Sequence, residues 1–272
     1  MSTRTSAPGP RCRRCLIPAN TARRIFGRPS LRSRSTRLAK TSAQKDEAGE
    51  AAGTGRRRES KEKRREQLIN ATIDSLARRG YASTTLANVS DGARLSRGIV
   101  NFHFDSKDNL LIETLQFMSD EYQANWKARY AASDDDTASR LAALVTADLD
   151  RAICTPRKVS AWFALMAEAK SRPAYQKLVW ERDARYRACL TENCRMAKEE
   201  ADYTFDPETV TAAIYAMQEG LWLRLALGGR EYRRATALKT ALEMLGTVFP
   251  CHFAPDGMPL LEAHRSKKGR RK

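Results

Sequence analysis

The residues whose order carries the most chemical information lie between Thr84 and Lys107. Two adjacent threonines and an apolar run precede a short turn, and the segment Ser96-Arg97-Gly98 then opens a new helix. Ser96 is suited to cap that helix, and the positive end of the helix dipole together with Arg97 favours phosphate groups or guanine edges. Gly98 lets the backbone approach DNA or a neighbouring helix closely. The chemistry of this segment is therefore anion binding and base reading rather than bond making.

Three short helices must position these residues. The apolar spacing predicts helices over 61–80, with Gly80 as the stop, over 85–92 and over 96–102, with a tight turn at 93–95. A supporting helix, a tight turn and a short exposed helix make a helix-turn-helix, whose second helix enters the major groove. The residues expected to lock the three helices in a core, rather than to contact DNA, are Ile99, Phe102 and Phe104.

The rest of the chain also follows helical periodicity. After a helix capped by Asp105-Ser106, further helices are predicted over 137–154, 156–171, 173–201, 207–227 and 232–248. Thr155-Pro156 and Asp206-Pro207 each pair an N-cap residue with a proline at the first helical position. The sequence therefore predicts an all-α protein of nine helices. We expect a disordered basic extension over 1–55, a helix-turn-helix domain over 56–110, a helical ligand-binding and dimerisation domain over 111–250, and a basic tail over 251–272.

The net charge of +17 over 272 residues indicates an anionic partner, with nucleic acid first and an anionic membrane surface second. Most of the surplus lies in the two tails, because residues 1–45 hold 12 Lys and Arg and no acid, and residues 265–272 hold six more. The basic run over 56–65 is either a solvated face or an arm that reaches the DNA backbone or minor groove. No apolar run approaches the roughly 18 residues that cross a bilayer, so no membrane partner is expected.

Enzymatic function finds little support in the sequence. The chain has three histidines and no HExxH, GxSxG or phosphate-binding loop, so an α-helical enzyme is the weaker hypothesis and no cofactor is expected. Cys12-x-x-Cys15 has the spacing of half a zinc site, but no second ligand pair lies nearby, so reduced thiols and no metal are expected. The Arg-rich start is either a plain extension or a transit peptide.

The segment from Arg64 to Leu111 resembles the DNA-binding domain of the TetR family of bacterial regulators. The threonine pair, the Ser-x-Gly, the aromatic-Phe end and the lysine that opens the next helix occur in the family order. Asn101 stands where the family commonly has a phosphate-contacting tyrosine, so that contact is weakened or replaced by the reading of an adenine edge. For His103, the alternative to a DNA contact is a role in packing. The resemblance implies these candidate DNA contacts: Thr84, Thr85, Arg94, Ser96, Arg97, Gly98, Asn101, His103 and Lys107.

Two later segments, 161–164 and 219–229, resemble the BetI branch of this family, the choline-responsive repressors of glycine-betaine synthesis. Choline is a quaternary ammonium, and aromatic faces with a nearby carboxylate hold such cations. Glu219 lies in an otherwise apolar run, where it needs a partner, and Arg224 is an alternative to a ligand. The candidate ligand contacts, each with core packing or a solvated position as its alternative, are Trp126, Trp162, Phe163, Glu168, Tyr215, Glu219 and Trp222.

The resemblance implies a homodimer that reads double-stranded, near-palindromic operator DNA in the bacterial cytoplasm, at the nucleoid. The helices over 207–227 and 232–248 are expected to form the dimer interface through Val210, Ile214, Met217, Leu221, Leu225, Leu238, Leu242 and Leu245. A small choline-like cation would lower operator affinity. The alternatives are a regulator of other genes with an unrelated ligand, acting as a repressor or an activator, and a protein that binds nucleic acid through its tails alone.

Overall fold

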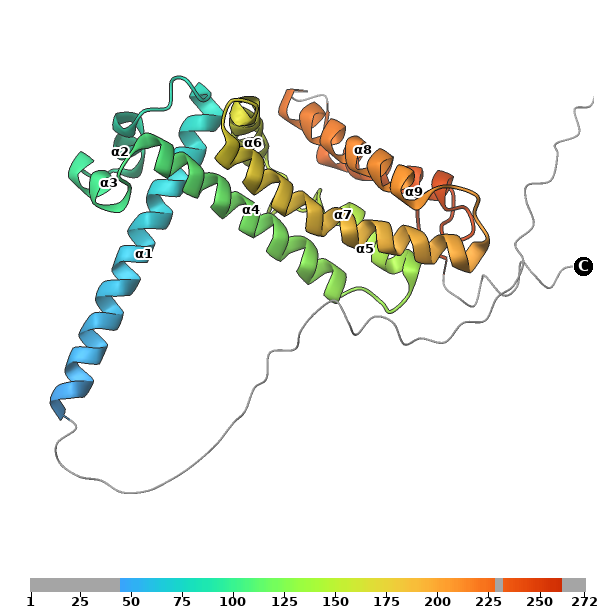
Figure 1. Cartoon of the computed structure of the whole chain (residues 1–272), viewed down its shortest axis with the longest axis horizontal. Coiled ribbons are helices and arrows are strands. Elements are labelled where there is room, and N and C mark those ends of the chain that lie inside the picture. The colour runs from blue at the N-terminus through green and yellow to red at the C-terminus, as the bar shows by residue number, and fades with distance from the viewer. Residues whose placement is uncertain (1–44, 228–231, 261–272) are drawn as a thin grey trace, which may run out of the picture. The chain divides into compact units, whose positions relative to one another are not determined.

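The computed structural model describes residues 45–227 and 232–260, with side chains from residue 60 onward. These residues form nine helices and no strand beyond one isolated bridge between Phe253 and Pro259, which confirms the all-α prediction (Figure 1). The helices are α1 (Lys45–Arg79), α2 (Leu86–Ala93), α3 (Arg97–His103), α4 (Lys107–Ala131), α5 (Thr137–Ala147), α6 (Pro156–Ala169), α7 (Pro173–Ala201), α8 (Pro207–Leu227) and α9 (Arg234–Val248).

The first helix begins earlier than its apolar pattern suggests. α1 starts at Lys45, so the prediction of disorder is wrong for residues 45–55, while residues 1–44, with Cys12 and Cys15, lie outside the described residues. Asp46 and Glu47 favour a helix N-terminus through the helix dipole, and the alanines that follow have high helix propensity. The basic run over 56–65 belongs to this helix. The chain divides by its contacts after Glu66, and the packing described below belongs to the unit that begins at Gln67.

The end of α1 packs with α2 and α3 around a small core. Leu68, Ile69 and Ile73 are fully buried with Val89 of α2, and Gly80 ends α1 with φ of 73°, as predicted. The side chain of Gln67 donates a hydrogen bond of 2.7 Å to the carbonyl of Ala93, which fixes the turn after α2. This places α3 on a rigid support.

The expected core role of Phe102 is wrong. Val100 and Phe104 are buried and Ile99 packs against them, but the Phe102 side chain is 71% exposed. Val100 and Phe104 are four residues apart and share one face of the turn, so a residue midway between them points to the opposite side. The helix-turn-helix therefore presents an aromatic ring to solvent.

α4 to α9 form the larger part of the unit. The long helices α4 and α7 run alongside each other, α8 packs on α6 and α7, and α9 packs on α5 and α8 (Figure 1). The Thr155 hydroxyl accepts a bond from the Lys158 amide at 3.2 Å, and the Asp206 carboxylate accepts one from the Thr209 amide at 2.8 Å. Both predicted cap-plus-proline starts are confirmed.

Two predicted boundaries need correction. α5 ends at Ala147 and not at Cys154, because an Asp150 carboxylate oxygen accepts a bond from the Ala152 amide at 2.8 Å and turns the chain. The C-terminal tail does not begin at residue 251, since His252 and Phe253 are buried beside Phe249. Residues 261–272 lie outside the described residues.

The apolar side chains of α8 and α9 divide between core and surface differently from the prediction. Ile214, Leu221 and Leu245 are buried within the chain's own core, so they are not free to form a subunit interface. The large apolar side chains of α8 that are exposed are Leu223, at 42%, and Leu227, at 76%. Among the described residues, no helix combines the length and apolarity needed to cross a membrane.

Candidate DNA interface and ligand pocket

The exposed surface of α3 carries three kinds of group whose chemistry suits base edges. Arg97, Asn101 and Phe102 are all exposed; Arg97 and Asn101 are four residues apart and share one side of the helix, and Phe102 projects from the side next to it. They offer a guanidinium, an amide and an aromatic ring, which suit guanine edges, adenine edges and thymine methyl groups respectively. Ser96 lies at the N-cap of α3, and its side chain makes no cap hydrogen bond. Its hydroxyl and the adjoining surface at Gly98 are exposed as well.

The two threonines of the motif have different surroundings. Thr85 is exposed at the N-cap of α2, where its hydroxyl accepts a bond of 3.2 Å from the Asn88 amide. Thr84 is 1% exposed, donates to the Gly80 carbonyl at 2.8 Å and lies 3.0 Å from the Ser75 hydroxyl. Thr84 therefore belongs to the interior, and only Thr85 shares the exposed surface.

The remaining candidate DNA contacts frame α3. Arg94 is exposed at the C-cap of α2 in the left-handed conformation, with φ of 54°. The ring of His103 is half-buried, 5.3 Å from the ring of Phe102 and perpendicular to it. The ammonium of Lys107 lies 5.1 Å from the centre of the Tyr81 ring and 3.4 Å from the Tyr81 carbonyl. This anchors Lys107 at the start of α4 with part of its charge still open to a phosphate.

A ligand pocket lies between α4, α6, α7, α8 and the residues that follow α5. Five of the predicted ligand residues line it: Trp162, Phe163, Tyr215, Glu219 and Trp222. Four further residues line it that the sequence pattern did not identify: Tyr122, Asp148, Arg182 and Gln218. The cavity left between these side chains is about 20 Å³, room for about one water molecule.

Two predicted ligand residues are not brought to the pocket. Trp126 is one turn beyond Tyr122 on α4 and lies behind Tyr186, with 5.7 Å between ring centres. Glu168 is near the end of α6, six residues beyond Trp162 and so on a different side of the helix. Arg224 does not pair with Glu219, because its guanidinium lies 5.3 Å from the centre of the Tyr232 ring.

Burial sets the protonation of the pocket acids. Burial raises the pKa of Asp148 to about 6, against the opposing effects of the Tyr122 hydrogen bond and the Arg182 charge. The Tyr122 hydroxyl donates to Asp148 Oδ1 at 2.6 Å, and the Trp222 indole N–H donates to the Asp148 carbonyl at 2.8 Å. Burial also raises the pKa of the half-exposed Glu219. Within the described chain neither acid has an ion-pair partner.

Among the described residues that line the pocket, Arg182 is the one cation, and it is itself buried. The Arg182 guanidinium donates from Nε to Asp183 at 2.7 Å and from one terminal nitrogen to the Tyr215 hydroxyl at 3.4 Å. Burial opposes its charge, but the Asp183 carboxylate and the Tyr122 and Tyr215 hydroxyl groups together outweigh that effect, and the pKa of Arg182 is raised. Arg182 therefore stays charged, and Asp148 and Glu219 leave the lining with an excess of acid.

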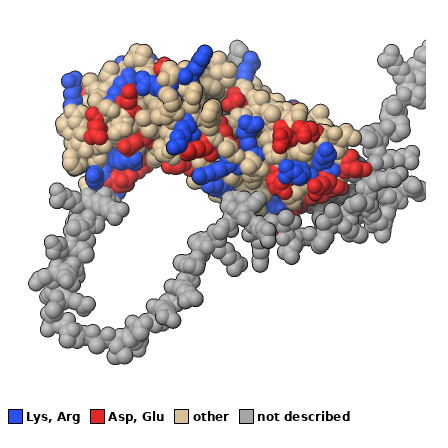
Figure 2. All heavy atoms as spheres, in the orientation of Figure 1, with Lys and Arg blue, Asp and Glu red and all other residues tan. Residues whose placement is uncertain are grey.

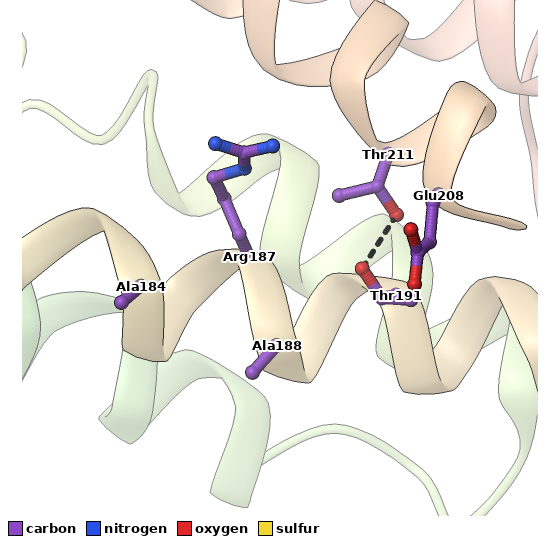
Figure 3. A pocket seen from close by; sticks show the side chains of 6 residues that line it. All are labelled: Ala184, Arg187, Ala188, Thr191, Glu208 and Thr211. Atoms are coloured by element: carbon purple, nitrogen blue, oxygen red, sulfur yellow. Dashed lines mark hydrogen bonds between the residues drawn. The ribbon is translucent and has the colours of Figure 1, made fainter. Parts of the chain in front are cut away.

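A second hollow lies on the surface between α7 and α8 (Figure 3). Its volume is about 240 Å³, and its rim includes a hydrogen bond of 3.0 Å between the hydroxyls of Thr191 and Thr211. Its other lining residues are Ala184, Arg187, Ala188 and Glu208. It is larger than the buried pocket but has no aromatic lining residue, so it does not match the cation chemistry predicted from the sequence.

Some of the residues that the sequence pattern did not identify still carry a signal. Arg182 falls on the same helical stripe as Tyr175, Tyr186 and Asn193, all of which are buried. A lone arginine on such a stripe marks a buried charge that needs partners. Asp148 has no comparable signal, since its burial depends on where α5 ends.

The comparisons with known proteins agree with this geometry. A model of the TetR family of bacterial regulatory proteins matches residues 68–114, and a model of the C-terminal region of BetI-type transcriptional repressors matches residues 137–250. The HTH-type transcriptional regulator BetI of Paraburkholderia phytofirmans is 32% identical over 189 residues, which cover 69% of this chain and 94% of that protein.

Two solved structures share the fold. A protein described as a transcriptional regulator from Pseudomonas aeruginosa PAO1 has a TM-score of 0.61 at 23% identity, covering 75% of this chain and 94% of that one. Another, from Saccharomonospora viridis and in complex with choline, has a TM-score of 0.59 at 19% identity, covering 66% and 94%. With its helix-turn-helix and its matched C-terminal region, the chain belongs to the TetR family of DNA-binding transcriptional regulators and carries a BetI-type C-terminal domain.

Proposed function

We propose that the chain is a repressor that binds a near-palindromic operator as a homodimer and releases it when a quaternary ammonium of the choline class enters the pocket. The genes that it controls would be those of glycine-betaine synthesis, with its site of action at the nucleoid in the cytoplasm. The observation that carries the ligand class is the buried pocket lined by Tyr122, Trp162, Tyr215 and Trp222 together with Asp148 and Glu219.

The pocket chemistry favours a cationic ligand. Aromatic faces attract a cation most strongly when it is desolvated, and carboxylates without an ion-pair partner supply the counter-charge. Asp148 and Glu219 are such carboxylates, and both line the pocket together with Trp222. The choline complex of the Saccharomonospora viridis protein, which has the same fold, supports the same ligand class.

The DNA contacts are proposed to centre on α3. Arg97 and Asn101 would read base edges, and Phe102 would contact a thymine methyl group. Thr85 and Lys107 would hold phosphates on either side and set the register of α3 in the groove. Ser96, Gly98 and Arg94 border this surface. On the face shown in Figure 2 basic and acidic side chains are intermixed, so local contacts and not a broad basic surface carry this proposal.

The exposed face of α8 supports a homodimer. Ala216, Gly220, Leu223 and Leu227 recur at intervals of three and four residues, and all four are exposed. The small residues let a second helix approach closely, while the leucines supply apolar area. A two-fold pairing through this face would place one α3 on each half of a palindromic operator.

A gel-shift titration tests these proposals with DNA from upstream of the chain's own gene. We expect a retarded band that choline abolishes, and that 3,3-dimethylbutan-1-ol, the uncharged isostere of choline, leaves in place. Absence of a band at low salt would contradict the operator proposal. A band that choline leaves unchanged contradicts only the proposed ligand class and favours a regulator with a different ligand. An equal effect of the uncharged isostere contradicts the cation-binding role of the aromatic faces.

A further inference from the structure

The aromatic faces of the pocket already hold a cation that belongs to the chain. The Arg182 guanidinium carbon lies 3.8 Å from the ring centre of Trp162 and 4.5 Å from that of Tyr122. Arg182 is 6% exposed, so these contacts are made away from water, where the attraction of a ring for a cation is strongest. The guanidinium therefore occupies the position that the aromatic rings make favourable for an organic cation.

The remaining space is too small for a second organic cation. The cavity between the lining side chains is about 20 Å³, which accommodates about one water molecule. A trimethylammonium group is several times larger than a water molecule. It fits against Trp162 and Tyr122 only when the guanidinium of Arg182 is elsewhere.

The acids beside the pocket offer the displaced guanidinium a second binding position. Arg182 already donates from Nε to Asp183, the next residue on α7, which is itself only partly buried. Glu219 lies on α8, is exposed, and is close enough to Asp183 and Arg182 for both charges to influence its pKa. A guanidinium turned outward would keep Asp183 and gain Glu219, while the incoming cation takes over the charge balance beside Asp148.

We infer that Arg182 is an internal occupant of the cation-binding pocket and that a quaternary ammonium binds by displacing its guanidinium. This inference rests on the proposed ligand class. It assigns Arg182 as a residue that sets affinity and specificity: only a cation that binds the two rings better than a guanidinium does can enter. The chain thereby excludes weakly bound amines and keeps the pocket filled and rigid in the absence of ligand.

Direct binding measurements with purified full-length protein test the inference. Tetramethylammonium and choline are titrated into the wild type, R182M and R182A, with calorimetry and tryptophan fluorescence as readouts. We expect R182M to bind both cations about tenfold more tightly than the wild type or better, because the competing desolvated cation–π contact is removed. R185M is the matched control: Arg185 is an exposed arginine of α7 that bonds to Gln123 and does not line the pocket, and its affinity should stay within about twofold of the wild type.

A second ligand, ethylguanidinium, distinguishes a folded R182A protein with an empty cavity from a misfolded one. R182A leaves a space shaped like the removed side chain, and ethylguanidinium should fill it, raise the thermal midpoint of R182A but not that of the wild type, and compete with tetramethylammonium. If purified R182A is unstable, ethylguanidinium is included during purification, and the same competition is then measured.

Each outcome bears on a different claim. Binding of tetramethylammonium by the wild type with no gain in R182M overturns the displacement inference and leaves the proposed ligand class intact. Stabilisation of R182A by ethylguanidinium, without binding of tetramethylammonium to any variant, contradicts the quaternary ammonium ligand and with it the displacement step. If neither cation binds any variant, both proposals fall.

Discussion

Arg157 of α6 bonds to Asp74 of α1, with Nε 2.7 Å from the carboxylate. A terminal nitrogen of the same guanidinium donates to the Asn70 carbonyl at 2.7 Å. α6 also carries Trp162 and Phe163 into the ligand pocket, while Asn70 and Asp74 lie on the helix whose buried face supports α3. One short helix therefore connects the pocket lining to the support of α3, the helix proposed to read DNA, and the proposed ligand response requires such a connection.

Replacing Asp74 by Asn should reduce the effect of choline on operator affinity. The affinity for choline alone and the affinity for operator alone should change less. D74N keeps the size of the side chain and removes the ion pair, which is half-exposed and contributes up to about 1 kcal/mol to stability. We expect choline affinity within about threefold of the wild type, and a smaller change in operator affinity on adding choline. Calorimetry without DNA and gel shifts with and without choline measure the two quantities.

The control for this prediction is K177M. Lys177 and Glu181 form an exposed pair within α7, with 3.9 Å between charged atoms, and connect no two helices. K177M should leave the coupling unchanged. A D74N protein with full coupling would show that α6 does not transmit the ligand effect through this contact.

Replacing Phe102 by Ala should weaken operator binding without unfolding the protein. The ring is 71% exposed, so its removal leaves no cavity, whereas losing the burial of the ring against a thymine methyl group in the major groove costs up to about 1.5–3 kcal/mol of affinity. Gel shifts at a fixed salt concentration measure the affinity, and thermal unfolding measures stability. F104A is the contrasting variant, because Phe104 is 1% exposed and its truncation should cost about 3–5 kcal/mol of stability. Unchanged operator affinity in F102A would remove Phe102 from the interface.

The helix-turn-helix could be predicted from the sequence because its signals are local. Gly80 ends α1 as its type and position predict, and Thr85, one of three neighbouring residues whose types suit an N-cap, caps α2. The predictions for Thr84 and Phe102 are wrong because the pattern gives the order of the residues but not which side of each helix meets the core. Deciding that Thr84 points inward requires the position of Ser75 on a different helix, 3.0 Å away.

The pocket was only partly predictable, because it is assembled by long-range packing. Trp162 and Trp222 were predicted through the resemblance of their segments, and both line the pocket. Asp148 lines it because α5 ends at Ala147, and that end depends on the turn at Asp150. Arg182 lies on a buried stripe of α7, but its contact with Trp162 depends on how α6 and α7 pack. Helical periodicity predicts which face of a helix is buried, but it does not predict which other helix packs against that face.

Charging the exposed face of α8 should separate the proposed dimer. In the double variant L223K/L227K, like charges from the two subunits would meet across the two-fold axis, where each patch faces its own copy. We expect a monomer by light scattering and a large decrease in operator affinity, because the two half-sites are no longer bound together. M258K introduces a lysine at another exposed apolar residue, 60% exposed and outside α8, and should remain dimeric. A dimeric L223K/L227K protein would move the interface away from this face.

Asp148 should make stability depend on pH in a direction opposite to that of most acids. Its pKa is raised from 3.8 to about 6 in the folded protein. The unfolded chain therefore releases this proton first, and the folded state loses stability as pH rises between about 4 and 6, by an amount on the order of 3 kcal/mol. D148N lacks this decrease and still accepts the Tyr122 hydrogen bond through its amide oxygen. Urea unfolding should show D148N gaining stability relative to the wild type between pH 4.5 and pH 7.5.

Asp150 provides a control of opposite sign two residues away. The bond from the Ala152 amide, followed by the Arg129 contact, lowers the pKa of Asp150. Its ionised form stabilises the folded protein above the pKa of the unfolded chain, and that contribution disappears as pH falls. D150N should therefore be less stable than the wild type by a nearly constant amount between pH 4.5 and 7.5, while D148N gains stability over that range, and the D150N difference should shrink only as pH falls below 3.8, the pKa of the unfolded chain. If D150N instead gains stability between pH 4.5 and 7.5 as D148N does, the pH effect comes from the net charge of the protein and not from the burial of the Asp148 carboxyl group.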